Sequence, residues 1–320
     1  MARRSALIMS APAPATRAEV LSAAAPVALR PLLIELNDLK RVRSAGRDGS
    51  IATRLFREAW GRLLAGEPAQ HVMLHVTATA LSAARLGDLD RATLRLVGLS
   101  EAEASETLVR AFDVVAQHIA TPLRDSLRVT LSRPLNDSPA APPQFVAALE
   151  AQPRAGVTCP GSPRIVLEPP ESHAEHCLMV AVYGALLAPA YGADPATAFL
   201  AGLSHHFHNV DMPDSGFTGE MLLAEHLTPV IYRCTRRILD ELDPPLRAQV
   251  ERARLVLADT GTPEGEAFHA ADVIDRVLQI AQHLRAASLT MDVVLGDMHL
   301  VHDGPVKPFH DRVLMEMALP

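Results

Sequence analysis

Six of the fourteen histidines of this 320-residue chain lie between His173 and His226. Histidine is the commonest metal ligand in proteins, because its neutral imidazole offers a nitrogen lone pair near pH 7. Within this segment His173 and His176 are three residues apart, and so are His205 and His208. Residues at this spacing share one face of a helix. The segment therefore predicts that two helices present histidines to a common pocket.

A third pair and an adjacent histidine extend this cluster. His206 follows His205 directly and is turned by about 100° around the helix axis. His269 precedes Asp272 by three residues on a later segment of helical pattern. Helical bundles build metal sites from inward-facing His and acidic residues on several helices. The three segments together therefore predict a metal site to which each of them could contribute ligands.

Five further residues are candidates for the lining of the same pocket. They are His173, His208, Asp211, His226 and His269. Asp275, one turn beyond Asp272, is expected to lie on the surface. The arginines of YRCTRRILDEL (Arg233, Arg236 and Arg237) could hold a phosphate, although the same segment is equally typical of a solvated helix face. The pattern assigns no catalytic residue.

The helices that carry these residues are marked by their composition and their ends. The segment from His173 to Ala188 is nearly all apolar beyond its first turn, which predicts a buried helix ending at Tyr191. Asp194 caps the next helix, with Pro195 at its first position, and that helix ends in the histidine run. Cys177 is expected to be a buried, unreactive thiol. Later helices are expected at 216–227, 229–242, 244–258 and 264–287.

The N-terminal part is helical in pattern but carries no recognisable chemistry. Residues 1–28 are rich in Ala, Pro and Ser and are expected to be flexible. Apolar residues recur three and four positions apart in residues 29–121, which predicts a small helical region. Within it, one helix is expected to begin after Ser50 and end at Gly66, and another to end at Gly87.

A proline-rich connector separates the two helical parts. Ser100 has capping-box spacing ahead of a helix that Pro122 is expected to close. Residues 122–170 contain ten of the chain's 25 prolines, which remove backbone donors and clash with a preceding helical turn. One short helix near 143–152 and a weak strand at Arg164–Leu167 are the elements expected there.

Together these segments predict an all-α protein. A flexible segment at 1–28 and a helical region at 29–121 precede the connector, and a helical domain at 171–298 and a tail at 299–320 follow it. Two His-Asp dipeptides in the tail, at 302–303 and 310–311, lie among Gly and Pro and are expected to be coincidental.

The histidine segments resemble the HD-domain superfamily of metal-dependent phosphohydrolases. That family has a His at a helix start, a His-Asp dyad closing a second apolar helix, and an Asp on a later helix. EHCLMVA resembles the first element through His176, AFLAGLSHHFHN the second through His205, and HAADVID the third through Asp272. The resemblance covers about residues 170–290. It implies an HD-like helical bundle with His176, His205, His206 and Asp272 as the metal ligands. It also implies hydrolysis of a phosphate ester, such as a nucleotide, by metal-activated water whose pKa is lowered towards 7.

His206 stands where the family has the dyad aspartate. A neutral imidazole does not readily bridge two metals, and it lowers the ligand charge by one. Three outcomes remain open: His206 binds a single Zn²⁺, Fe²⁺ or Mn²⁺ ion, a nearby carboxylate such as Asp211 substitutes, or the site is inactive. A His-rich ligand set favours one of these transition metals over Mg²⁺.

Two other functions remain open beside hydrolysis. The family includes di-iron oxygenases with additional histidines, a role that His208, Glu220 and His226 could fill here. A degenerate bundle could instead serve as a non-catalytic binding or regulatory module, with its histidines packed in the core and bonded to backbone carbonyls. The substitution at His206 motivates this second alternative directly.

Composition limits the partners of the chain. A net charge of −7 and a pI near 6.0 disfavour nucleic-acid binding through a basic surface. Lysine occurs only at Lys40 and Lys307. The three cysteines show no paired spacing, and neither a signal peptide nor a membrane span is expected, so a cytoplasmic location is predicted. The expected partner is a small phosphate ester, and a homo-oligomer is compatible with the sequence.

Overall fold

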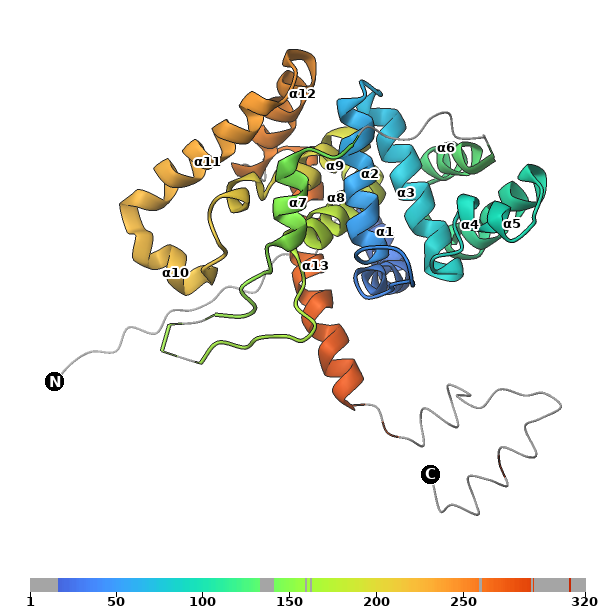
Figure 1. The fold of residues 1–320 in the computed structure, drawn as a ribbon, viewed down its shortest axis with the longest axis horizontal. Coiled ribbons are helices and arrows are strands. Elements are labelled where there is room, and N and C mark those ends of the chain that lie inside the picture. Colours follow the sequence, from blue (N-terminus) through green and yellow to red (C-terminus); the bar gives the residue numbers. More distant parts are fainter. Residues whose placement is uncertain are drawn as a thin grey trace. The chain divides into compact units, whose positions relative to one another are not determined.

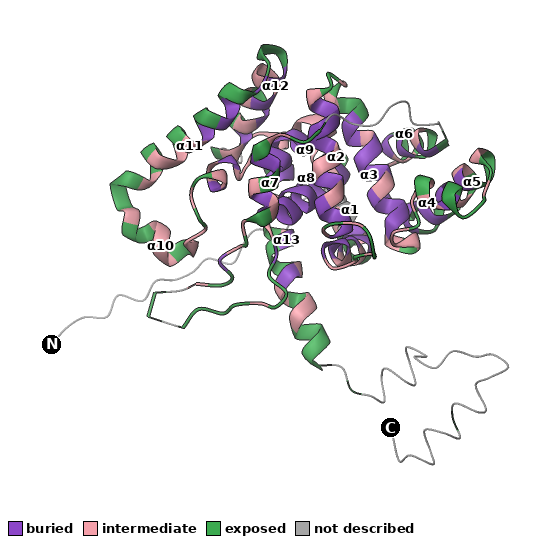
Figure 2. Ribbon diagram, viewed as in Figure 1, coloured by how far each residue is buried: buried purple, intermediate pink, exposed green. Residues whose placement is uncertain are grey.

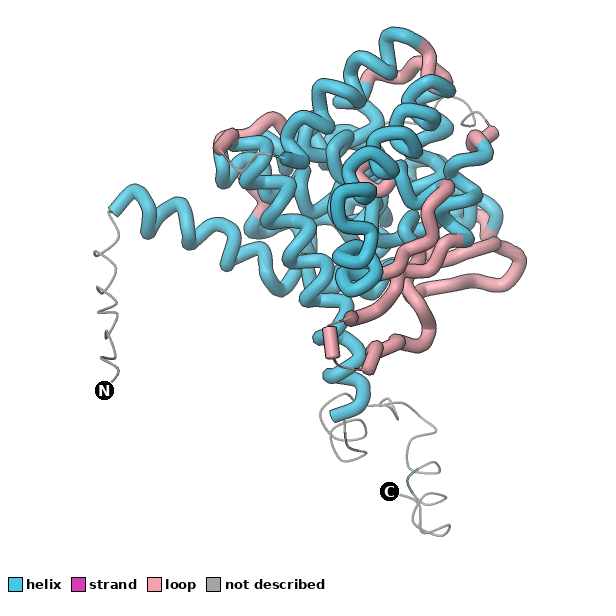
Figure 3. Tube along the Cα trace, turned by 90° about the vertical axis from the view of Figure 1, so that its left-hand side faces the viewer, coloured by secondary structure: helices cyan, strands magenta, loops and turns pink. Residues whose placement is uncertain are grey.

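The structure is a computed structural model that describes residues 17–132, 141–158, 160–161, 163–258, 261–288, 290 and 311. Side chains are described from residue 26 onward. Every regular element in these residues is a helix, and extended segments pair only through two isolated bridges, Pro153 with Ser172 and Val157 with Ile165. The prediction of an all-α fold is confirmed (Figures 1 and 3).

Thirteen α-helices lie in the described ranges, joined by loops and short 3-10 turns. They are α1 (Arg17–Asn37), α2 (Ile51–Leu64), α3 (Ala69–Leu86), α4 (Arg91–Leu96), α5 (Glu101–Val115), α6 (Thr121–Ser132), α7 (Gln144–Ala151), α8 (His173–Tyr191), α9 (Pro195–Ser204), α10 (Gly216–Leu223), α11 (Leu227–Glu241), α12 (Pro244–Arg254) and α13 (Pro263–Ser288). The chain divides into two compact units, Met1–Asp275 and Arg276–Pro320. The candidate site lies wholly within the first unit.

Helix α8 forms the centre of the first unit. Every side chain from His173 to Ala188 is buried, as the continuous apolar sequence predicts (Figure 2). A capping box of Ser172 and Glu175 begins the helix, and Gly192 ends it in the left-handed conformation. Helix α8 also has the length and hydropathy of a membrane-spanning helix, but 83% of that stretch is buried inside the protein. Such burial is typical of the core helix of a soluble protein.

Helix α9 packs closely along α8 and thereby brings the histidine run to the start of α8. The contact depends on Gly202, because a Cβ at this position would lie 2.5 Å from the Cα and N atoms of Ala181. After α9, a 3-10 turn at Phe207–Val210 continues the chain. Phe207 is fully buried against Trp60 of α2 and Phe145 of α7, with ring centroids 5.3 and 5.4 Å away.

The N-terminal helices share this core. Helices α1, α2 and α3 all contact α8. Tyr183 on α8 donates a hydrogen bond to the carbonyl oxygen of Leu33 on α1, at 2.8 Å. Ser50, the cap of α2, donates to Glu175 Oε1 at 2.6 Å. Residues 29–121 and the helices that follow the connector therefore belong to one packed unit.

Several predicted boundaries differ from the structure. Helix α1 begins at Arg17, inside the segment expected to be flexible, and residues 1–16 lie outside the described residues. Pro122 closes no helix: it lies in the first turn of α6, where a missing N–H costs little because that donor has no intrahelical partner. The expected strand at Arg164–Leu167 is reduced to the single bridge of Ile165. The short helix near 143–152 is confirmed as α7.

Candidate metal centre

Three of the four predicted ligands converge at the junction of α8 and α9. His176 lies in the first turn of α8, His205 directly follows α9, and His206 is the next residue. Their rings are neighbours, with centroids 5.0 Å apart for His176 and His205 and 4.2 Å apart for His205 and His206. One ligand atom from each lies within 4.8 Å of the other two. Asp272 on α13 approaches the same point, with Oδ1 3.3 Å from His176 Nε2.

The hydrogen bonds at Nδ1 fix the tautomers of His176 and His205. His176 Nδ1 lies 2.7 Å from Asp275 Oδ2, and His205 Nδ1 lies 2.7 Å from the carbonyl oxygen of Gly202. A carbonyl and an ionised carboxylate only accept hydrogen bonds, so both Nδ1 atoms carry the proton. The lone pair of each ring is therefore on Nε2.

His206 follows the same pattern through Asn209. The amide nitrogen of Asn209 donates to the carbonyl oxygen of Met212 at 3.0 Å, which turns its oxygen towards His206. His206 Nδ1 then donates to that oxygen at 2.7 Å, and the lone pair is again on Nε2. Hydrogen bonds of this kind from the distal ring nitrogen are the usual partners of metal-bound histidines.

The spacing of the Nε2 atoms fits a bound cation. His176 Nε2 and His205 Nε2 lie 3.1 Å apart, and in the neutral Nδ1-protonated form of both rings each of these atoms carries a lone pair. Two nitrogens bound to one tetrahedral zinc at about 2.0–2.1 Å lie roughly 3.3–3.4 Å apart. Burial lowers the pKa of His205 and of His206 well below the usual value, with neighbouring histidines adding to the effect. These two rings therefore stay neutral, and the three histidines could hold a metal ion.

Arg154, which the sequence did not single out, contacts this set. It lies on the connector just after α7, and its side chain is 19% exposed. Its Nη1 donates to His206 Nε2 at 3.2 Å, and its Nε lies 3.9 Å from Asp214 Oδ2. The guanidinium thus shares the lone pair that His206 would offer to a metal, and it brings a positive charge to the pocket.

A second group of potential ligands already surrounds a cation. Glu171, His176 and Asp275 also lie within ligand distance of one another. However, the Nζ of Lys40 lies 2.5 Å from Glu171 Oε1 and 2.6 Å from Asp275 Oδ1. Burial raises the pKa of Asp275, but the charge of Lys40 and the hydrogen bond from His176 outweigh it, so the pKa is lowered. The expectation that Asp275 lies on the surface is wrong, since its exposure is 0%.

Two of the additional candidates lie beside His206. His173 is fully buried, its ring lies 4.6 Å from that of His206, and neither of its nitrogens has a hydrogen-bond partner. Burial lowers the pKa of His173 to about 2. His208 is half-buried with its ring 5.5 Å from that of His206, and burial lowers its pKa to about 4. His269 packs on Phe268, whose ring in turn contacts His205.

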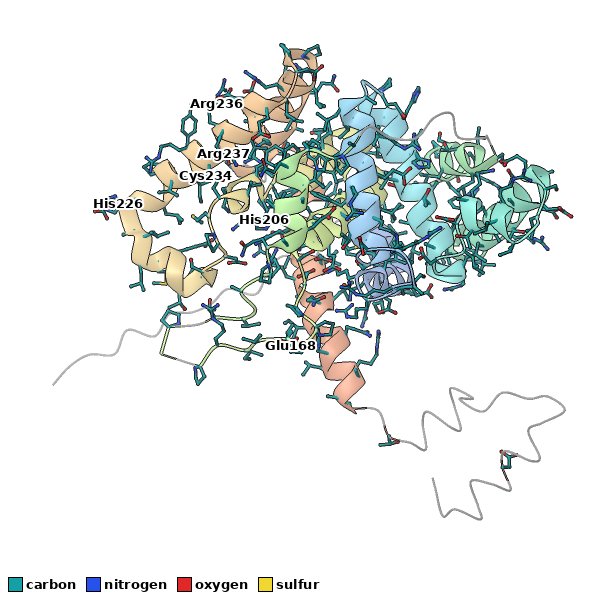
Figure 4. The ribbon with its side chains drawn as sticks, viewed as in Figure 1. Glu168, His206, His226, Cys234, Arg236 and Arg237 are labelled. Atoms are coloured by element: carbon teal, nitrogen blue, oxygen red, sulfur yellow. The ribbon has the colours of Figure 1, made fainter. Side chains whose placement is uncertain are left out.

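Two other candidates lie away from the pocket. Asp211 is on the surface, where both of its oxygens accept hydrogen bonds from Arg237. The carboxylate near the histidines is Asp214, whose Oδ2 lies 3.7 Å from His173 Nε2. The side chain of His226 is 76% exposed beside Glu225, far from His206 (Figure 4).

The remaining sequence candidates have ordinary structural roles. Arg236 and Arg237 form surface ion pairs with acidic side chains of α11 and its surroundings, and Arg233 is exposed. Cys177 is buried, and burial raises the pKa of its thiol, as expected for an unreactive cysteine. Of the two His-Asp dipeptides in the tail, all residues but Asp311 lie outside the described part of the chain.

Comparisons with family models, with curated proteins and with solved structures give no match for this chain.

Proposed function

We propose that the chain is a metal-dependent hydrolase of a phosphate ester, with an HD-like site formed by His176, His205, His206 and Asp272. The observation that carries the proposal is the common tautomer of the three histidines. Each donates from Nδ1 to a fixed acceptor, which leaves the Nε2 lone pair of each neutral ring for a metal ion. A carboxylate oxygen of Asp272 lies 3.3 Å from one of these nitrogens.

The donor set favours a single transition metal ion. Three neutral imidazoles and one carboxylate suit Zn²⁺, Fe²⁺ or Mn²⁺ better than Mg²⁺, which prefers oxygen ligands. His206 replaces the carboxylate that would bridge two ions, so one ion fits this set better than two. When bound, such an ion supplies Lewis acidity and lowers the pKa of a coordinated water towards 7.

Residues next to these four ligands would contact the substrate. Arg154 carries the positive charge nearest to the histidines, and a guanidinium binds phosphoryl oxygens well through its fork of N–H groups. If a metal takes the lone pair of His206, the N–H group of Arg154 becomes available to an anion. His173 stays neutral at pH 7, and its two ring nitrogens have no hydrogen-bond partner among the described residues.

The contact between Arg154 and His206 also favours a second function. The guanidinium donates to the lone pair of His206 at 3.2 Å, a contact that needs no metal. The alternative is a metal-free bundle that acts as a binding or regulatory module. Iron-dependent oxygenation on the same scaffold lacks such support, because no carboxylate stands at the position of the bridging dyad residue.

Elemental analysis tests the proposal. The protein is purified without chelators and without metal-affinity resin, alongside His205→Ala and the control His226→Ala, in which an exposed histidine is removed. We expect about one transition metal ion per chain in the wild type and the control, little in His205→Ala, and phosphatase activity that follows the metal. Metal-free wild-type protein that takes up none on reconstitution would contradict the proposal and favour the binding module. Two iron ions per chain with dioxygen-dependent turnover would favour the oxygenase.

A further inference from the structure

Lys40 is a buried cation at the edge of the histidine cluster. It ends the 3-10 turn Asp38–Lys40 after α1, and it is only 4% exposed. Its Nζ contacts two carboxylates from distant parts of the chain, Glu171 just before α8 and Asp275 on α13. Both of these side chains are also buried.

Asp275, which contacts Lys40, also contacts the candidate metal ligand His176. Lys40 Nζ donates a hydrogen bond to Asp275 Oδ2 at 2.8 Å and forms a close ion contact with Oδ1 at 2.6 Å. Oδ2 in turn accepts the Nδ1 proton of His176 at 2.7 Å. The chain of contacts therefore fixes the orientation of the carboxylate, the direction of the imidazole and the location of its lone pair.

Stability alone does not account for this group. A buried ion pair stabilises the fold little more than apolar residues of similar volume would. The free energy required to remove the charges from water is about as large as the free energy gained from their attraction. A role in orienting His176 gives the three charges a function.

We propose that Lys40 is a positioning residue of the metal centre, acting through Asp275 to hold His176 with its Nε2 lone pair towards His205. This inference rests on the proposed function and extends it, because it makes the N-terminal region part of the site. The hydrogen-bond partners of metal-bound histidines typically change metal affinity by about 10- to 100-fold when they are removed.

Lys40→Met tests this role with two measurements. Nitrogen-15 NMR of histidine-labelled, metal-free protein reports the tautomer of His176, whose signals are assigned by their absence in His176→Gln. We expect a single tautomer protonated at Nδ1 in the wild type and a mixture in Lys40→Met. Titration with Zn²⁺ should show an affinity about 10- to 100-fold lower in the variant.

Arg62→Met is the matched control. Arg62 is a buried cation with an exposure of 3%, and it is ion-paired with Glu58 and Glu67. Its loss should lower stability but leave the His176 tautomer and the Zn²⁺ affinity unchanged. If Lys40→Met does not fold, Lys40→Met combined with Glu171→Gln removes one charge of each sign and leaves Asp275 facing His176 alone.

The outcomes separate the two proposals. A wild type that binds Zn²⁺, together with a Lys40 variant of unchanged tautomer and affinity, overturns the role of Lys40 and leaves the proposed function standing. A wild type that binds no Zn²⁺ overturns both. If Arg62→Met reproduces the loss of Zn²⁺ affinity, then the loss of any buried cation disturbs the site. This result would contradict a specific role for Lys40.

Discussion

At the scale of single residues, the candidate centre is defined by what each imidazole bonds to on its outer side. A carboxylate, a backbone carbonyl and an amide oxygen each accept an Nδ1 proton, from His176, His205 and His206 respectively. The histidines therefore need no metal to adopt the binding tautomer. The Nε2 atoms of His176 and His205 face each other at 3.1 Å, and Asp272 Oδ1 lies 3.3 Å from that of His176. The Nε2 atom of His206 accepts a hydrogen bond from Arg154.

Arg154→Ala should raise the affinity for a transition metal. The variant removes a competing donor from His206 and a positive charge that repels the ion. A hydrogen bond involving a charged group contributes about 1.5 kcal/mol, and this corresponds to about tenfold in affinity. Calorimetric titration with Zn²⁺ in phosphate-free buffer measures the change, with Arg57→Ala as control because Arg57 pairs with Glu150 instead. An affinity that stays the same or falls would show that Arg154 does not compete for His206.

At the scale of elements, the site depends on how closely α8 and α9 approach. The sequence predicts both helices well, because an apolar run between clear caps marks α8 and the pair Asp194 and Pro195 marks the start of α9. It does not predict their separation. Gly202 sets that separation, and in the sequence it is one small residue among several.

Gly202→Ala should damage both stability and the site. The added methyl group would lie 2.5 Å from backbone atoms of Ala181, so the helices must separate and carry His205 away from His176. Overpacking of this kind costs about 1–3 kcal/mol, which urea denaturation measures, and metal content should fall with it. Gly184→Ala is the control at the same interface, since its Cβ would meet Ala198 at 3.4 Å. Equal effects of the two substitutions would contradict a special role for Gly202.

At the scale of the whole molecule, sequence patterns located the ligands but not the groups that orient them. Periodicity indicates which residues share a helix face, and together with the family resemblance it singled out His176, His205, His206 and Asp272, which lie close together in the structure. It carries no information about partners far away in the chain. Lys40 meets Asp275 across 235 positions, and Arg154 meets His206 across 52. Such contacts follow from tertiary packing, which also joins the N-terminal helices to α8.

Metal binding should therefore stabilise the N-terminal helices together with the site. Trp60 is the only tryptophan, it is fully buried on α2, and its ring contacts Phe207 next to His206. A ligand present at about 100 times its dissociation constant stabilises a protein by about 2.7 kcal/mol. Added Zn²⁺ should raise the thermal midpoint seen by Trp60 fluorescence as much as that seen by circular dichroism, and it should raise neither in His205→Ala. If the metal shifts only the circular dichroism midpoint, the helices before the connector unfold independently, and the packing of α2 on α8 does not couple them to the metal centre.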